Sequence, residues 1–121
     1  MEHCLVIDDN RQTTEALMKI LDLFDIPARS ALSPSAAMAI LKEMTPRVVF
    51  LDINMPGVDG FEVLAYLKRE PRTMGIPVII VTSDDQPETA RRARDGGADA
   101  LVLKPVMVDA LEEALQKVGI L

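Results

Sequence analysis

The sequence predicts an open α/β fold: one doubly wound parallel sheet of five strands, with five helices on its two faces. Short apolar runs alternate five times with segments of helical periodicity, which is the pattern of parallel strands joined by crossover helices. The runs are apolar at consecutive positions, so the strands are buried on both faces and need helices on both sides. A closed barrel of the same ten elements would leave its short closing strands without enough partners. With 121 residues, the chain has the length of one domain, residues 1–121.

The first two strand–helix pairs are predicted before residue 45. The apolar run of residues 4–7 is typical of a buried strand, and helical spacing then places four apolar residues on one face, namely Leu17, Ile20, Leu21 and Phe24. A weaker strand, residues 28–32, follows Pro27. Ser33 is suited to the N-cap of the next helix and Pro34 to its first turn. The inward stripe of that helix is predicted to be Ala37, Ile40, Leu41 and Met44.

The central strand is predicted at residues 48–53, where four apolar residues are followed by Asp52. A third helix begins at Phe61 and fades near Pro71. Pro77 introduces a fourth strand at residues 78–81, which is again a continuous apolar run.

The last third of the chain repeats the pattern twice more. The helix predicted at residues 89–95 has few large apolar residues, so we expect it to be loosely packed and easily shifted. Gly96 and Gly97 end it, and a fifth strand follows at residues 100–103. The final helix is predicted to turn four residues inward, which are Val108, Leu111, Leu115 and Val118.

Composition excludes several classes of protein. The chain has 13 basic and 19 acidic side chains, a formal charge of −6, so we expect no direct contact with nucleic acid. It has no run of about 18 or more apolar residues and no basic segment before its short N-terminal apolar run, which argues against membrane insertion and a signal peptide. Cys4 is the only cysteine, so an internal disulfide is excluded, and a reducing, cytoplasmic setting is expected.

Polar side chains follow four of the five predicted strands. These residues are Asp8, Asp9, Asp52, Thr82, Ser83 and Lys104. Each alone is ordinarily a turn, cap or solvated residue, but the carboxyl ends of parallel strands meet at one edge of a sheet. Three carboxylates gathered there would repel by about 4 kcal/mol per close pair at an effective dielectric constant near 20. One lysine cannot balance three acids, so a further cation is needed, and hard oxygen ligands of this kind predict a magnesium ion. His3 and Cys4 lie at the opposite end of the sheet, so we do not expect them to be ligands.

Magnesium, a carboxylate, a lysine and a hydroxyl together indicate the handling of a phosphoryl group. The carboxylate can attack phosphorus in line, and the cations and the hydroxyl can stabilise the phosphoryl oxygens. The sequence has no glycine-rich loop of the Walker or dinucleotide type, so the phosphoryl group is expected to come from elsewhere than a bound nucleotide.

In these motifs the chain resembles the receiver domain of two-component response regulators, which are CheY-like. The resemblance covers essentially the whole chain through four stretches in the family's order and separation: VIDDN (6–10), VVFLDINMPGVDG (48–60), VIIVTS (78–83) and GGADALVLKP (96–105). It implies a flavodoxin-like fold with strand order 2-1-3-4-5. The chain ends at Leu121, so a stand-alone receiver and a piece of a longer protein both stay open, and Met1 slightly favours the first.

The resemblance also implies roles for single residues. Asp52 would be the phosphoacceptor, taking phosphate from a histidine kinase or a histidine phosphotransfer protein. Asp8 and Asp9, with Asp52, would hold Mg²⁺, and Asn54 would add its backbone carbonyl. Thr82 would turn its hydroxyl toward the phosphate.

Further expectations concern the residues around the phosphate and the output surface. Lys104 would pair with the phosphate, and its peptide bond to Pro105 would be cis. Three residues before the lysine the family usually has Tyr or Phe, whereas this chain has Leu101, so a rotating aromatic ring cannot be its readout. The fourth helix, fifth strand and fifth helix are still expected to contact the downstream partner. Asp84 and Asn54 are hypothesised to orient the water that removes the phosphate.

Two rival functions are weighed against this phosphorylation-controlled binding module. One is a degenerate receiver that acts as a scaffold without phosphorylation, and the presence of every acidic and basic site residue disfavours it. The other is a small Mg²⁺-dependent phosphatase. Such enzymes usually need an acid two residues after the nucleophile to protonate the leaving group, and that place is Asn54 here, so we expect no turnover enzyme.

Overall fold

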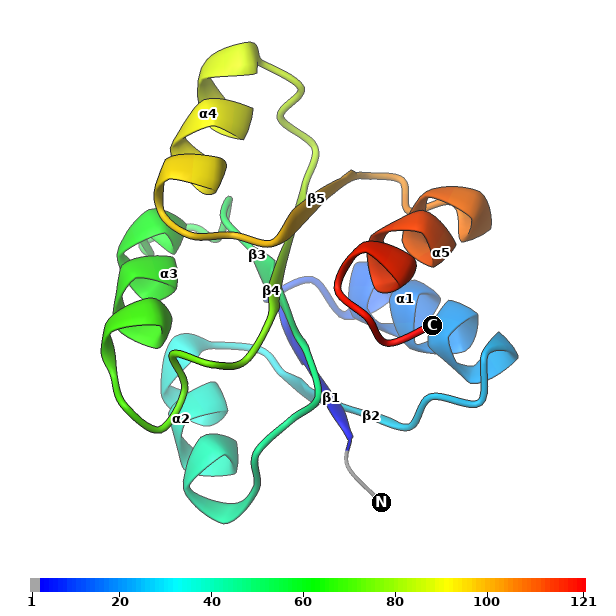
Figure 1. Ribbon diagram of the computed structural model, residues 1–121, viewed down its shortest axis with the longest axis horizontal. Helices are drawn as coiled ribbons and strands as arrows, with labels where there is room; N and C mark the ends of the chain where they lie inside the picture. The colour runs from blue at the N-terminus through cyan, green and yellow to red at the C-terminus, as the bar shows by residue number, and fades with distance from the viewer. Residues whose placement is uncertain (1–2) are drawn as a thin grey trace.

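Five strands and five helices alternate along the chain, and Figure 1 shows their arrangement. The structure is a computed structural model that describes residues 3–121; the first two residues of the predicted domain lie outside the described residues. The elements are β1 Cys4–Ile7, α1 Arg11–Leu23, β2 Ala28–Ala31, α2 Pro34–Glu43, β3 Val49–Asp52, α3 Gly60–Arg69, β4 Val78–Thr82, α4 Pro87–Asp95, β5 Ala100–Leu103 and α5 Val108–Lys117. The predicted five strands and five helices are confirmed.

The five strands form one parallel sheet in the order β2-β1-β3-β4-β5. Helices α1 and α5 cover one face, and α2, α3 and α4 cover the other (Figure 1). The strand order reverses between β1 and β3, and in open sheets of this type the ligand crevice lies at such a point, at the carboxyl ends of the strands. The predicted doubly wound topology is confirmed.

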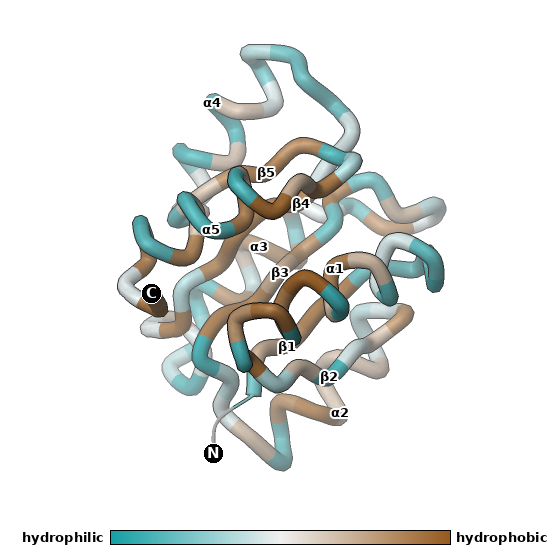
Figure 2. Tube along the Cα trace, turned by 90° about the vertical axis from the view of Figure 1, so that its right-hand side faces the viewer, coloured by the Kyte–Doolittle hydropathy of each residue, from teal (hydrophilic) through white to brown (hydrophobic). Residues whose placement is uncertain are grey.

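Each face of the sheet has its own hydrophobic core, because successive side chains of a strand point to opposite faces. In β3, Val49 and Leu51 pack toward α2 and α3, whereas Phe50 packs toward α1 and α5. All three side chains are fully buried, and each contributes about 1.5–3 kcal/mol by leaving water. Figure 2 shows hydrophobic residues concentrated along the central strands, while α4 is largely hydrophilic.

Side-chain caps set where three of the helices begin. The Oδ1 of Asn10 accepts the Thr13 N–H at 3.0 Å and starts α1, a cap that the apolar spacing alone did not reveal. The Ser33 Oγ accepts the Ala36 N–H at 3.1 Å, which confirms the N-cap predicted for α2. At α3 the cap is Asp59. Capping of this kind satisfies donors that a helix cannot pair internally.

Some predicted positions differ from the structure. Val108 was expected to face inward, but it is the first residue of α5 and is 42% exposed. The buried face of that helix consists of Leu111, Ala114 and Leu115. Phe24 and Met44 follow the last turns of α1 and α2 rather than belonging to them.

The two buried residues of α4, Thr89 and Ala93, both have short side chains, in keeping with the scarcity of large apolar residues in its sequence. Gly97, at φ +96°, follows its end and turns the chain toward β5, as the glycine pair suggested. None of the helices among residues 3–121 has the length and apolar character needed to cross a bilayer.

Candidate functional site

Three carboxylates meet at the carboxyl ends of β1 and β3. Asp8 and Asp9 follow β1 and Asp52 ends β3, and one oxygen of each lies within 4.8 Å of the others. The side chains of Asp8 and Asp52 are buried, whereas Asp9 is exposed. The neighbouring parallel strands β1 and β3 end at the same edge of the sheet, which is why residues more than forty positions apart in the sequence come together.

Lys104, which follows β5, inserts its ammonium group between two of these acids. Its Nζ lies 3.0 Å from Asp8 Oδ2 and 3.3 Å from Asp52 Oδ2. Three carboxylates and one ammonium leave a formal charge of −2 at the cluster. Hard oxygen ligands with excess negative charge are what Mg²⁺ requires, so the residues fit the ion that the sequence predicted.

The two buried carboxylates are held in the same way. Asp8 Oδ1 accepts the Asn10 N–H and Asp52 Oδ1 accepts the Asn54 N–H, each at 2.9 Å. In both residues the other oxygen, Oδ2, faces Lys104. Each carboxylate therefore has a fixed orientation before any ligand binds, which lowers the cost of arranging a reactive group.

Burial raises the pKa of Asp52 above its ordinary value of 3.8. The hydrogen bond from the Asn54 N–H and the charge of Lys104 act in the opposite direction, and the charge of Asp8 adds to the rise. Burial thus dominates, because the charged form loses more solvation than its neighbours restore.

Thr82, the last residue of β4, is fully buried at the carboxyl end of its strand, the same edge of the sheet that carries the acidic cluster. Its Oγ1 accepts two hydrogen bonds, from the Asn54 Nδ2 at 2.7 Å and from the Asp84 N–H at 3.0 Å. A hydroxyl has two lone pairs and one hydrogen, so both acceptor positions are used. The remaining function of this hydroxyl is to donate its hydrogen, as contact with an anionic oxygen would require.

Asp84 connects this strand end to α4. Its carboxylate accepts the Thr89 Oγ1–H at 2.6 Å and the Gln86 N–H at 2.9 Å, and these two hydrogen bonds lower its pKa. The structure therefore gives protein partners to both side chains that we expected to orient water, Asp84 and Asn54. The contact with Thr89 was not predicted from the sequence. The available signal was Asp84, three residues before a helix that begins at Pro87.

The loop after β3 returns tightly against the strand end that carries Asp52. A Cβ on Gly60 would lie 2.3 Å from the Ile53 Cα, so only glycine fits there. Gly57 has φ +74°, in the left-handed region. The peptide bond between Lys104 and Pro105 is cis, as the resemblance implied.

Leu101 does not fill the place beside α4. A cavity of about 250 Å³ lies there, lined by Leu101 of β5 together with short side chains of α4 such as Ala90 and Ala93. Two cations, Arg94 and Lys117, and one acid, Asp99, also line it. The region predicted to contact a downstream partner is thus hollow.

Comparisons with known proteins agree with this geometry. The family model of the response regulator receiver domain matches residues 4–116. The two-component response regulator ORR13 of Oryza sativa subsp. japonica is 33% identical over 107 residues, 88% of this chain and 88% of that protein. The DNA-binding dual master transcriptional regulator RpaA of Synechocystis sp. is 31% identical over 111 residues; the match covers 92% of this chain and 46% of RpaA.

A solved structure gives the same result in three dimensions. The signal receiver domain of a DNA-binding response regulator protein from Colwellia psychrerythraea 34H superposes with a TM-score of 0.88 at 28% identity, and the match covers 97% of each chain. The sequence match, the strand order and the fold all coincide over nearly the full length. The chain belongs to the response regulator receiver domain family.

Proposed function

We propose that this protein is a receiver that is switched by phosphorylation of Asp52 and signals through altered binding to a partner. Receiver domains of response regulators interact with histidine kinases or phosphotransfer proteins, and the family typically binds Mg²⁺. The observation that carries the proposal is the cluster of Asp8, Asp9 and Asp52 with Lys104 inserted between two of its members. The proposed domain comprises residues 1–121, and the proposed setting is the cytoplasm.

In the proposed reaction, an oxygen of Asp52 attacks the phosphorus of a phosphohistidine. The bond from phosphorus to the donor imidazole nitrogen breaks, the electron pair stays on that nitrogen, and an acyl phosphate forms on Asp52. Lys104 is already within 3.3 Å of the attacking carboxylate and would contact a phosphoryl oxygen. Thr82 would donate its hydroxyl hydrogen to another. Mg²⁺ held by the three aspartates and the Asn54 backbone carbonyl would neutralise developing charge on the phosphoryl group.

The proposed readout passes through Thr82 to α4. If the Thr82 hydroxyl turns toward the phosphate, its oxygen leaves the Asn54 side chain and the Asp84 N–H. Asp84 in turn holds Thr89, one of the two buried residues of α4. A helix with so little buried surface is displaced at small cost. The surface formed by α4, β5 and α5 would therefore change without an aromatic ring at Leu101.

We propose a signalling role rather than turnover catalysis. The residue two positions after the nucleophile is Asn54, whose side chain donates to Thr82 and has no proton to give to a leaving group at neutral pH. The chain would assist only the phosphorylation and hydrolysis of its own aspartate. Its formal charge of −6 also argues that the partner is a protein rather than nucleic acid.

Intact-mass analysis after incubation with Mg²⁺ and acetyl phosphate tests the proposal. The wild type should gain one phosphoryl group, and Asp52→Asn should gain none. Asp59→Asn is the matched control, because Asn caps a helix as well as Asp does and the variant should still be phosphorylated. A wild type that gains no phosphoryl group would indicate a scaffold, and release of phosphate over many turnovers would indicate a phosphatase; either result rejects the proposal.

A further inference from the structure

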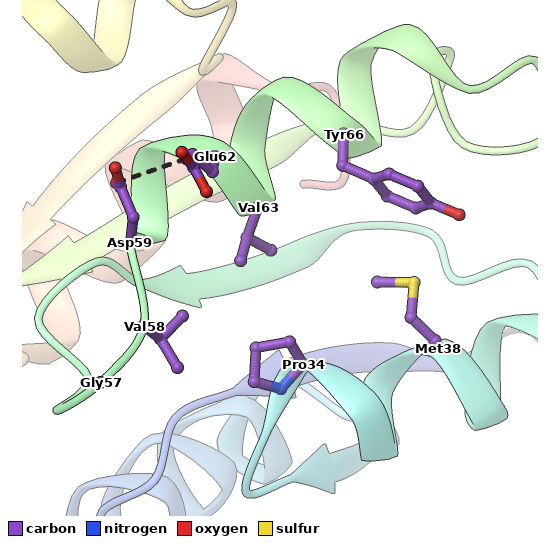
Figure 3. A pocket seen from close by; sticks show the side chains of 8 residues that line it. All are labelled: Pro34, Met38, Gly57, Val58, Asp59, Glu62, Val63 and Tyr66. Atoms are coloured by element: carbon purple, nitrogen blue, oxygen red, sulfur yellow. Dashed lines mark hydrogen bonds between the residues drawn. The ribbon is translucent and has the colours of Figure 1, made fainter.

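A groove separates α2 from α3 on the face of the sheet opposite α1 and α5. Its larger part, about 400 Å³, is lined by apolar side chains of both helices and by the loop that follows Asp52. In Figure 3, Val58 and Val63 point toward Pro34, and Tyr66 and Met38 approach each other from opposite sides. None of these residues belongs to the phosphorylation site.

The apolar side chains of the groove are accessible to solvent. Tyr66 is 38% exposed, and Met38, Val58 and Val63 are only half-buried against the core. Single exposed apolar residues are common on protein surfaces, but a concave group of them favours binding of a partner. The groove has the volume of a typical ligand site.

The charges along this part of the groove have one sign. Asp59 and Glu62 line it, and its lining contains no cationic side chain. Asp59 accepts the N–H groups of Phe61 and Glu62, so its charge is partly balanced by the start of α3. The carboxylate of Glu62 forms no ion pair with any residue in the described part of the chain.

The groove continues past Tyr66 and Met38 into a second part of about 240 Å³. Lys42 and Arg72 line that part together with one acid, Glu70, so cations outnumber acids there, whereas the first part has acids alone. Each of the two flanking helices has ten residues, a length of about 15 Å, which a third helix of about three turns would match.

We infer that the groove between α2 and α3 is a docking site for a short amphipathic segment of a partner protein, with an apolar anchor and an adjacent Lys or Arg. The anchor would fill the space between Val58, Val63 and Tyr66, where it removes apolar surface from water. The basic residue would lie beside Glu62, the unpaired carboxylate. This polarity follows from charge complementarity, because the same end of the groove offers an approaching acid only repulsion.

The site is continuous with the loop that carries the phosphoacceptor. Gly57 and Val58 line the groove and lie five and six residues after Asp52. The Val58 N–H donates to the Met55 carbonyl at 3.0 Å, and Met55 is buried. A segment bound in the groove would therefore contact the loop that follows Asp52. The docking proposal itself does not require phosphorylation.

A random library of displayed peptides, each about twelve residues long, provides an unbiased probe. Peptides enriched on the unphosphorylated wild type are synthesised with a fluorescent label, and their affinities are measured by fluorescence anisotropy. Enriched sequences should pair an apolar residue with a neighbouring Lys or Arg. Their affinity should fall about five-fold for Glu62→Lys, because an attractive exposed pair becomes repulsive. It should fall at least as much for Tyr66→Gln.

Glu112→Lys is the matched control, because Glu112 is an exposed acid on α5, on the opposite face of the sheet. This substitution should leave the peptide affinity within two-fold of wild type, or about 0.4 kcal/mol. Circular dichroism spectra and urea-unfolding midpoints close to those of the wild type should show that all three variants fold. Enriched peptides that bind Glu62→Lys and Tyr66→Gln as tightly as wild type, or a library without enrichment, would overturn the inference. Concentration-dependent dimers that Glu62→Lys dissociates would also overturn it in favour of a second copy of this chain.

Discussion

Replacing Lys104 with methionine should destabilise the protein strongly, and more so as the pH rises. The ammonium group lies 3.0 Å from Asp8 and 3.3 Å from Asp52, and its side chain is 18% exposed. At an effective dielectric constant near 20, these distances correspond to attractions of about 5.5 and about 5 kcal/mol. Methionine avoids the several kcal/mol that burying an ammonium group costs, so the net loss of folding stability is much smaller than the sum of the two attractions. Removing one partner of a buried pair costs about 3–5 kcal/mol, and the partial exposure of Lys104 places this variant near about 3 kcal/mol.

The pH dependence follows from the pKa of Asp52. Burial raises this pKa, and Lys104 is one of the groups that lower it, so the variant should raise it further. A carboxyl whose folded-state pKa exceeds its unfolded value destabilises the fold once it ionises. That cost is absent below the ordinary pKa of 3.8 and appears as the pH rises through the folded-state value. The destabilisation should therefore be larger at about pH 7.5 than at about pH 4.5.

Urea unfolding without divalent ions measures the effect, with the slope of the transition as a check on two-state behaviour. Adding Asp52→Asn to the lysine variant should recover at least half of the loss at neutral pH, because it removes one of the two carboxylates that faced Lys104. Lys117→Met, at the exposed end of α5, should change stability by less than about 0.5 kcal/mol. A loss below about 1 kcal/mol for Lys104→Met, or an equal loss at both pH values, would refute the electrostatic account.

Three further substitutions or reactions test other parts of the structure. Gly60→Ala places a Cβ 2.3 Å from the Ile53 Cα and should lower the free energy of unfolding in urea by about 1–3 kcal/mol. Gly75→Ala is the control, because open space surrounds Gly75 and stability should change little. Equal costs for the two variants would contradict the close approach at Gly60. Asp84→Ala removes the hydrogen bonds to Gln86 and Thr89 and should therefore speed amide hydrogen exchange in the first turn of α4. Asp85→Ala is the control and should leave that exchange unchanged. Unchanged exchange in Asp84→Ala would show that the Asp84 carboxylate does not hold the helix. Burial raises the pKa of Cys4 to about 11, so a thiol reagent at about pH 8 should label it only after unfolding, and rapid labelling of the folded protein would contradict its burial.

The sequence by itself determined the architecture and the composition of the acidic cluster. Short runs of consecutive apolar residues such as 48–51 are typical of strands covered on both faces, and the helical spacing between them supplies the covering layers. Parallel strands end at a common edge, so Asp8, Asp52 and Lys104 could be placed together from their positions after apolar runs. These properties depend on local periodicity and on chain direction, both of which can be seen in one dimension.

Only the tertiary structure decided which groups contact one another at that edge. The hydrogen bonds of Thr82 with Asn54 and Asp84, and that of Asp84 with Thr89, depend on how a loop leaves the sheet and on where α4 packs. The exposure of Val108, the first residue of α5, depends likewise on where that helix begins and packs. Side-chain partners are chosen by distances of a few tenths of an ångström between separate elements, and periodicity within an element carries no information about such distances.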